Sequence, residues 1–318
     1  MNKRIPAITQ KQVAAFLKPR PCDSHKSLFG TVVEIGGASG MVGAPLLAAR
    51  AALKMGAGCV HVGLLADNAP VVDMIQPELM LHSAQEALRL AVDSIRDIKN
   101  SVIPAQAGIQ SNKNTGFPPS RERQNMVLAV GCGMGISVTA QKILYEALKT
   151  DAALVLDADA LNLLARQPDL QDDLRTRKAP SVITPHPGEA SRLLGISTEQ
   201  VQAARTEAAQ QLAKKLHCSV ALKGADSVCV TRDGKTYFNK TGNPGMSSPG
   251  MRDVLTGMIA ALIAQGLDTD QALLLAVHLH GAAGDALAQQ GIAIGMTATE
   301  VTEWARWLLN QWVKQLHN

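Results

Sequence analysis

The segment TGNPGMSSPGMRDVLTG, residues 241–257, combines the features needed to bind an anion and to move a proton. Its glycine-rich first part runs into a long apolar stretch that is expected to be a helix beginning at about Asp253. The free N–H groups at a helix start bind anions such as phosphate. An aspartate there either caps the helix or takes a proton from a hydroxyl that attacks a bound phosphate. We favour the second role, because a helix cap alone does not require so many glycines and prolines before it.

A second reactive segment is TPHPGE, residues 184–189, at the end of an apolar run. The two prolines that flank His186 restrict its backbone, and Glu189 falls in the first turn of a predicted helix, where a negative charge suits the helix dipole. Single histidines are more often structural, but this setting favours a ligand contact for His186. In contrast, His278 and His280 precede a helical stretch and are expected to pack.

Three further glycine-containing loops each follow an apolar run: GGASGMVGA (36–44), GCGMG (131–135) and KGADS (223–227). None has the spacing of a dinucleotide-binding fingerprint or of a phosphate-binding P-loop. In a parallel sheet such loops gather at the carboxyl ends of the strands, where open α/β sheets bind ligands. Lys223 either meets a phosphate there or is solvated at the end of its strand.

Two acids in DADALN, Asp157 and Asp159, follow another apolar run. Such a pair could hold Mg²⁺ through water, because Mg²⁺ keeps several waters and takes few carboxylates. Alternatively, Asp159 caps the helix predicted to follow. Both roles remain open for Asp159, and a structural role is favoured for Asp157.

The elements that must position these residues are strands and helices in alternation. Continuous apolar runs, separated by helical patterns, predict a largely parallel sheet that is covered on both faces. Asp233-Gly234, between two strand-like runs, predicts a hairpin at a sheet edge. After Asp253 the pattern is nearly all helical, with turns near Gly266 and Gly295. Strands are expected in TVVEIGG, CVHVGLL, MVLAV, AALVL, SVI and SVAL, and a helix over 42–55.

Composition narrows the possible classes. The chain has 318 residues, of which 46% are hydrophobic, and its net charge is +4. This excludes a disordered chain, and the balanced charge argues against nucleic acid as a partner. No run of 18 apolar residues predicts a membrane span, and the first residues lack the apolar core of a signal peptide. Five scattered cysteines, none in a CxxC pair, predict reduced thiols in a cytoplasmic protein.

One segment departs from the alternation. Residues 101–125 contain three prolines, two glycines and many amides, and they show no periodicity. A loop of this length is uncommon inside a compact domain, so we predict a surface insertion. Because the chain shows no internal repeat and no other change of composition, residues 1–318 are predicted to form a single domain with this one insertion.

The motifs stand in an order that resembles the ADP/ATP-dependent NAD(P)H-hydrate dehydratases. The resemblance rests on GMVGA, GCGMG, DADALN, TPHPGE, KGADS, TGNPGM, DVLTG and HLHGAAGD, and it covers about residues 25–310 apart from the insertion. It implies a ribokinase-like fold, a three-layer α/β/α sandwich with a mostly parallel central sheet. It also implies a carbon–oxygen lyase that repairs the hydrated (6S) form of NADH or NADPH. A nucleotide phosphorylates the ring hydroxyl, and elimination of phosphate restores the dinucleotide.

The resemblance also implies roles for individual residues. Asp253 would be the catalytic base. The hydrated dinucleotide would contact Ala44, Gly135, His186 and Asp253. The nucleotide would be bound by Lys223, Gly224, Ala225, Asp226, Ser227 and Arg252. ADP or ATP would be the co-substrate, with Mg²⁺ assisting through ligands that the motifs do not identify. A cytoplasmic homotetramer working with an NAD(P)H-hydrate epimerase is expected, and a stand-alone chain is more typical of the ADP-using bacterial type.

Arg252 departs from the family pattern, which has glycine directly before the catalytic aspartate. Glycine there lets backbone N–H groups reach phosphate, whereas an arginine either obstructs the phosphate or binds it through its guanidinium. Two other functions remain open at this point. One is a ribokinase-like kinase of a small vitamin-precursor alcohol, and the other is a degenerate nucleotide-binding protein without activity.

Overall fold

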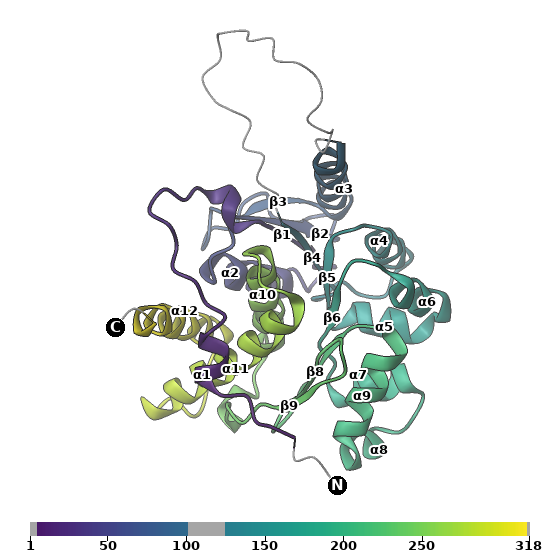
Figure 1. Cartoon of the computed structure of the whole chain (residues 1–318). Helices are drawn as coiled ribbons and strands as arrows, with labels where there is room; N and C mark the ends of the chain where they lie inside the picture. Colours follow the sequence, from purple (N-terminus) through teal and green to yellow (C-terminus); the bar gives the residue numbers. More distant parts are fainter. Residues whose placement is uncertain (1–4, 101–124, 317–318) are drawn as a thin grey trace, which may run out of the picture.

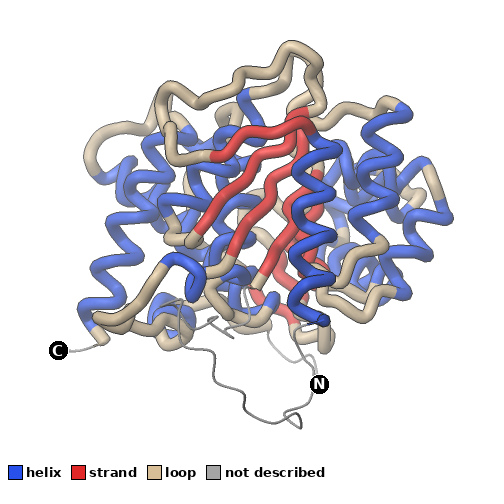
Figure 2. The backbone as a smooth tube through the Cα atoms, turned by 90° about the horizontal axis from the view of Figure 1, so that it is seen from above, coloured by secondary structure: helices blue, strands red, loops and turns tan. Residues whose placement is uncertain are grey.

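The computed structural model describes residues 5–100 and 125–316, in which one nine-stranded sheet lies between two layers of helices (Figures 1 and 2). The strand order is β3-β2-β1-β4-β5-β6-β7-β8-β9. All neighbours pair in parallel except β7–β8 and β8–β9, which are antiparallel. The strands are β1 (Thr31–Gly36), β2 (Cys59–Leu64), β3 (Met80–Ser83), β4 (Met126–Val130), β5 (Ala153–Leu156), β6 (Ser181–Ile183), β7 (Ser219–Leu222), β8 (Val228–Val230) and β9 (Thr236–Phe238).

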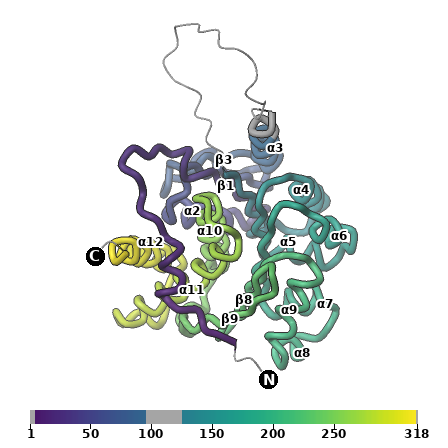
Figure 3. The backbone as a smooth tube through the Cα atoms, in the orientation of Figure 1, coloured from purple at the N-terminus to yellow at the C-terminus, as the bar shows by residue number. Residues whose placement is uncertain are grey.

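The helices divide between the two faces of the sheet (Figure 3). One face packs against α1 (Gln10–Ala14), α2 (Gly43–Lys54), α10 (Met251–Ala264), α11 (Thr269–Gln289) and α12 (Ala298–Gln315). The other packs against α3 (Ala84–Asn100), α4 (Val138–Leu148), α5 (Asp159–Arg166), α6 (Pro168–Thr176), α7 (Pro187–Leu194), α8 (Thr198–Ala203) and α9 (Arg205–Leu216). The predicted three-layer α/β/α sandwich is therefore confirmed.

Alternation along the strands builds the two cores. In β1, Val32 packs on the α10 side, whereas Val33 and Ile35 pack on the α3 side. Successive side chains of a strand point to opposite faces, so a strand buried on both faces needs a continuous apolar sequence. Glu34 is the exception in β1. Its side chain points to the same face of the sheet as that of Val32, and only 1% of the residue is exposed.

Most elements lie where the sequence predicts them, and the β8–β9 hairpin turns at Asp233-Gly234 on the sheet edge as expected. The short edge strand β3 has no counterpart in the sequence prediction, because its four residues are exposed or half-buried and show no apolar run. Helix α10 begins at Met251, two residues before the predicted start.

The predicted insertion, residues 101–125, lies outside the described residues except for Asn125. The carbonyl of Asn125 accepts a hydrogen bond from the Thr31 N–H at 2.9 Å, at the start of β1. Among the helices of the described ranges, none has the length and apolar character required to cross a bilayer.

Candidate active site

Two glycine loops meet at the carboxyl ends of β1 and β4. The N–H of Gly37 donates to the Cys132 carbonyl at 3.0 Å, and the N–H of Ala38 donates to the Gly133 carbonyl at 2.7 Å. A Cβ added at Gly36 would lie 2.0 Å from the Cys132 carbonyl oxygen, so only glycine permits this approach. These two loops therefore lie together at the carboxyl ends of the strands, as predicted.

The two residues predicted to contact substrate on these loops are Ala44 and Gly135. Ala44 is the last residue of the first loop and already lies in the first turn of α2. The N–H of Gly135, in the second loop, donates to the Asp159 carboxylate at 2.8 Å. Asp159 also accepts from the Asn162 side chain at 3.1 Å. Asp159 therefore holds the second loop in place. The structure does not make it the N-cap of α5, since that position belongs to Ala158.

Asp157 has partners of its own at the end of β5. Its fully buried carboxylate accepts from Lys223 Nζ at 2.5 Å and from Thr256 Oγ1 at 3.1 Å. Asp157 and Asp159 are thus engaged with different partners, and a role for them in holding Mg²⁺ through water stays a prediction. The ammonium group of Lys223, after β7, is likewise committed to a buried ion pair. That pair ties together β5, β7 and α10.

Asp253 lies in the first turn of α10, behind the glycine-rich loop. Gly250 is the residue before this helix and has φ +86°, a conformation that glycine adopts without strain. Asp253 is partly exposed. Burial raises its pKa to about 6, outweighing the hydrogen bond with Cys132 and the charges of Arg252 and Lys223, which lower it. Such a carboxylate is mostly ionised at pH 7 and still basic enough to accept a proton.

The glycine-rich loop is fastened to α11 by a residue that the sequence analysis did not single out. The carboxylate of Asp285 accepts from the Gly242 N–H at 2.9 Å and from the Asn243 side chain at 3.1 Å. Thr241 adds a bond to the His278 carbonyl at 2.9 Å. The only sequence signal for Asp285 is that it is the acid ending the HLHGAAGD motif.

His186 is the N-cap of α7. Its Nδ1 accepts the Gly188 N–H at 3.0 Å, and its Nε2 lies 3.2 Å from Glu189 Oε1. Burial lowers the pKa of His186 to about 4, and the charges of Arg252 and Lys223 act in the same direction. The ring is therefore neutral at pH 7, and the bond to Nδ1 leaves its proton on Nε2. His186 thus has a structural role as a helix cap, and because its side chain is 37% exposed a ligand contact stays a prediction.

Arg252 extends toward the same cluster. Its Nη1 lies 3.6 Å from Glu189 Oε1, while 54% of its side chain is exposed. Burial raises the pKa of Glu189, and Lys223 and Arg252 oppose that shift. Four residues predicted from the sequence to form the site therefore act on one another electrostatically: His186, Lys223, Arg252 and Asp253.

The turn at residues 223–227 exposes Gly224, Ala225 and Asp226 at the end of β7. Arg205 lies beneath it and donates to the carbonyls of Leu222 and Lys223. The Asp226 carboxylate pairs with Lys240 at 2.5 Å, which balances a negative charge beside the predicted nucleotide site. Ser227 closes the turn by donating to the Gly224 carbonyl at 3.0 Å.

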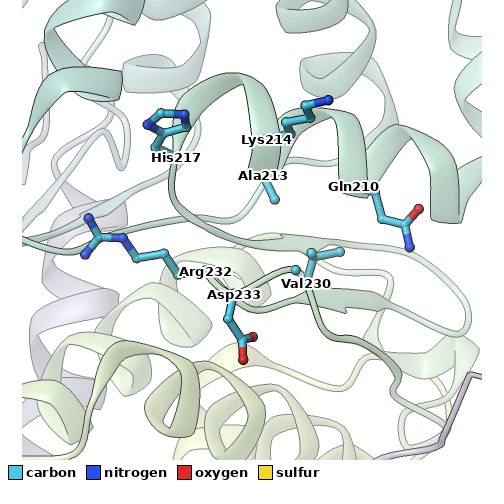
Figure 4. Close-up of a pocket in the computed structure, with 8 residues that line it drawn as sticks. Gln210, Ala213, Lys214, His217, Val230, Arg232 and Asp233 are labelled. Carbon is cyan, nitrogen blue, oxygen red and sulfur yellow. The ribbon is translucent and has the colours of Figure 1, made fainter.

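A cavity of about 480 Å³ lies elsewhere, between α9 and the β8–β9 hairpin (Figure 4). Val220 at the start of β7 pairs with Val230 at the end of β8, so the hairpin turn lies at the amino end of β7. Ligands of open α/β sheets bind at the carboxyl ends of the strands. The cavity is therefore not part of the cluster around Asp253. It is lined by Gln210, Ala213, Lys214, His217, Val230, Arg232, Asp233 and Gly234.

Comparison with known proteins identifies related chains. Residues 32–306 match the family model described as NAD(P)H-hydrate dehydratase. An ADP-dependent (S)-NAD(P)H-hydrate dehydratase from Neisseria meningitidis is 37% identical over 94% of this chain and 91% of its own. The bifunctional NAD(P)H-hydrate repair enzyme of Escherichia coli is 34% identical over 96% of this chain, which spans only 54% of that longer protein.

The structural comparison agrees with the sequence comparison. The ADP/ATP-dependent NAD(P)H-hydrate dehydratase of Bacillus subtilis, co-crystallised with ATP/Mg²⁺, superposes with a TM-score of 0.77. It is 27% identical, and the match covers 98% of this chain and 99% of that one. The ribokinase-like fold predicted from the motifs is thereby confirmed.

Proposed function

Because the chain belongs to the NAD(P)H-hydrate dehydratase family, we propose that it restores NADH or NADPH from the hydrated (6S) forms, with ADP or ATP as co-substrate. The observation that carries this proposal is the setting of Asp253. It lies partly exposed on the first turn of α10, and its pKa of about 6 suits a base that works near neutral pH.

In the proposed reaction, Asp253 accepts the proton of the ring hydroxyl as the hydroxyl oxygen attacks the terminal phosphoryl group of the nucleotide. The bond from that phosphorus to the rest of the nucleotide breaks. The C–O bond to the ring then breaks, phosphate leaves with the electron pair, and the adjacent ring carbon loses a proton to form the double bond. The N–H groups at the start of α10 would stabilise the charge on the transferred phosphoryl group.

Substrate and nucleotide would meet beside Asp253. We propose that Ala44, Gly135 and the partly exposed ring of His186 contact the hydrated dinucleotide. The exposed turn at 223–227 and Arg252 would contact the nucleotide. Lys223 would act mainly through its ion pair with Asp157, which fixes the end of β7 under that turn.

Mg²⁺ would enter with the nucleotide. In the described part of the chain, no group of three or more histidine, cysteine or acidic residues is arranged to hold a metal ion. The described residues therefore show no cage of protein ligands for Mg²⁺. Mg²⁺ commonly takes its ligands from substrate phosphates and water, which agrees with this arrangement.

The wider setting follows from the same family membership. We propose a cytoplasmic homotetramer that works with an NAD(P)H-hydrate epimerase, since bifunctional repair enzymes are among the relatives. Residues 1–318 would form one domain, with residues 101–125 as its surface insertion.

The proposal is tested by incubating the protein with hydrated NADH and either ADP or ATP. Restored NADH is followed by the absorbance of its dihydronicotinamide ring. We expect turnover only with nucleotide present, and the faster nucleotide identifies the preferred co-substrate. Nucleotide binding without turnover in the wild-type protein would instead support the degenerate binding protein. A stable phosphorylated product from a vitamin-precursor alcohol would support the kinase.

A further inference from the structure

Glu34 is a buried carboxyl group that the proposed reaction does not use. It lies in the middle of β1, in register with Val62 of β2 and Ala129 of β4, and all three face the layer that contains α10. Only 1% of Glu34 is exposed, and its Oε1 has no hydrogen-bond partner within the described residues. A buried charged carboxylate in such a place is strongly unfavourable, whereas a neutral carboxylic acid is tolerated.

The neighbours of Glu34 are acidic. The carboxylates of Asp253, on α10, and Asp157, after β5, both act on it, and Glu34 in turn acts on the Cys132 thiol after β4. The buried cation beside these groups is Lys223, which is already bound to Asp157, while the half-exposed Arg252 acts on Asp253. Burial and the two carboxylates raise the pKa of Glu34 well above its ordinary value. Both the burial of Glu34 and its acidic neighbours therefore favour its protonated form.

We propose that Glu34 is a positioning residue of this active site: it stays protonated in the active enzyme, and its neutrality lets Asp253 remain ionised beside the Asp157–Lys223 ion pair. The proposal rests on the proposed function. If Glu34 lost its proton, a second buried carboxylate would join Asp157 beside the partly exposed Asp253, with Lys223 as the buried cation. The added charge would push a proton onto Asp253, which would then no longer accept one from substrate. It would also repel the phosphates arriving at the start of α10.

The first test is the pH profile of kcat/KM for the wild type and for Glu34→Gln, whose amide is always neutral. We expect the wild-type rate to fall at alkaline pH as Glu34 ionises. The Glu34→Gln protein should remain within about threefold of the wild type at pH 7 and should lose the alkaline fall. As a matched control, Glu207→Gln on the exposed side of α9 should keep the wild-type profile. An unchanged alkaline fall in Glu34→Gln would overturn the proposal.

A second test needs no activity. Because the pKa of Glu189 is also raised, infrared spectra of ¹³C-glutamate-labelled wild type and Glu34→Gln are compared, and the wild type should show at pH 7 a carbonyl band of a buried protonated carboxylic acid that Glu34→Gln lacks. The band should disappear at alkaline pH. Its absence at pH 7 would overturn the proposal. Failure of the proposed function would show separately, as a wild-type protein that has the band but does not turn over hydrated NADH.

Discussion

Two charged regions lie at opposite ends of the parallel strands, one at the carboxyl ends and one at the amino end of β7. They differ in how deeply their charged side chains are buried. Around Asp253 the charges of Asp157 and Lys223 are almost fully buried. Around the cavity beside α9, Lys214 and Arg232 are exposed. Buried charges must be paired and shift one another's pKa, whereas exposed charges are screened. The difference shows that desolvated charge, rather than the cavity beside α9, marks the candidate site.

The largest effect is expected from breaking the buried ion pair. Lys223→Met leaves the Asp157 carboxylate buried without its cation, which should lower the free energy of unfolding by about 3–5 kcal/mol. Chemical denaturation measures this loss. The double variant Lys223→Met/Asp157→Asn removes both charges and should recover a large part of the stability. If the single variant unfolds like the wild type, the pair does not support the fold.

Asp253→Asn tests the chemical role of the same region. The amide keeps the shape of the side chain but cannot accept a proton, so turnover should fall about a hundredfold or more with little change in stability. In the wild type, kcat/KM should decline as the pH falls through about 6, where Asp253 becomes protonated. Asp172→Asn, at the exposed ion pair with Arg175 on α6, is the matched control. Wild-type turnover in Asp253→Asn would remove the catalytic assignment.

The sequence predicts some parts of this region and misses others for a physical reason. Asp253 and His186 lie among glycines and prolines, so their neighbours in the chain indicate an unusual backbone conformation. Glu34 stands in an ordinary strand pattern, and Asp285 in an ordinary helix pattern. Glu34 matters through its electrostatic interaction with Asp253, and Asp285 through its hydrogen bonds to the loop at Gly242; both partners are distant in the chain.

The same distinction explains the fold and the errors. Buried strands such as β4 are continuous apolar runs, which any pass along the sequence can find. Strand β3 is a half-exposed edge and carries no such pattern. Asp159 looks like a helix cap in the chain, but the carboxylate is taken by the Gly135 N–H of a different loop. A partner of that kind can be identified only once the strands are ordered in space.

Arg252→Gly is expected to have a smaller effect, because the arginine side chain is half-exposed and reaches Glu189 only at 3.6 Å. We expect that removing the arginine side chain gives the phosphate access to the backbone N–H groups. Turnover and the affinity for ADP or ATP should then each rise by about fivefold, equivalent to about 1 kcal/mol. Steady-state kinetics and calorimetric titration measure the two quantities. Weaker nucleotide binding in Arg252→Gly would show instead that the guanidinium binds phosphate.

The smallest effect is expected in the region at the amino end of β7. Lys214→Ala/Arg232→Ala removes two exposed cations beside the cavity of Figure 4. Each is solvated, so the free energy of unfolding should change by no more than about 0.5 kcal/mol for each substitution. The affinity for ADP or ATP should be unchanged, because the cavity lies at the amino end of β7 and the nucleotide is proposed to bind at its carboxyl end. A marked loss of nucleotide affinity in this variant would place the nucleotide in the cavity and reverse the comparison of the two regions. Unchanged nucleotide affinity in this variant, together with the loss of stability in Lys223→Met and the loss of turnover in Asp253→Asn, would locate the functional charges at the carboxyl ends of the strands.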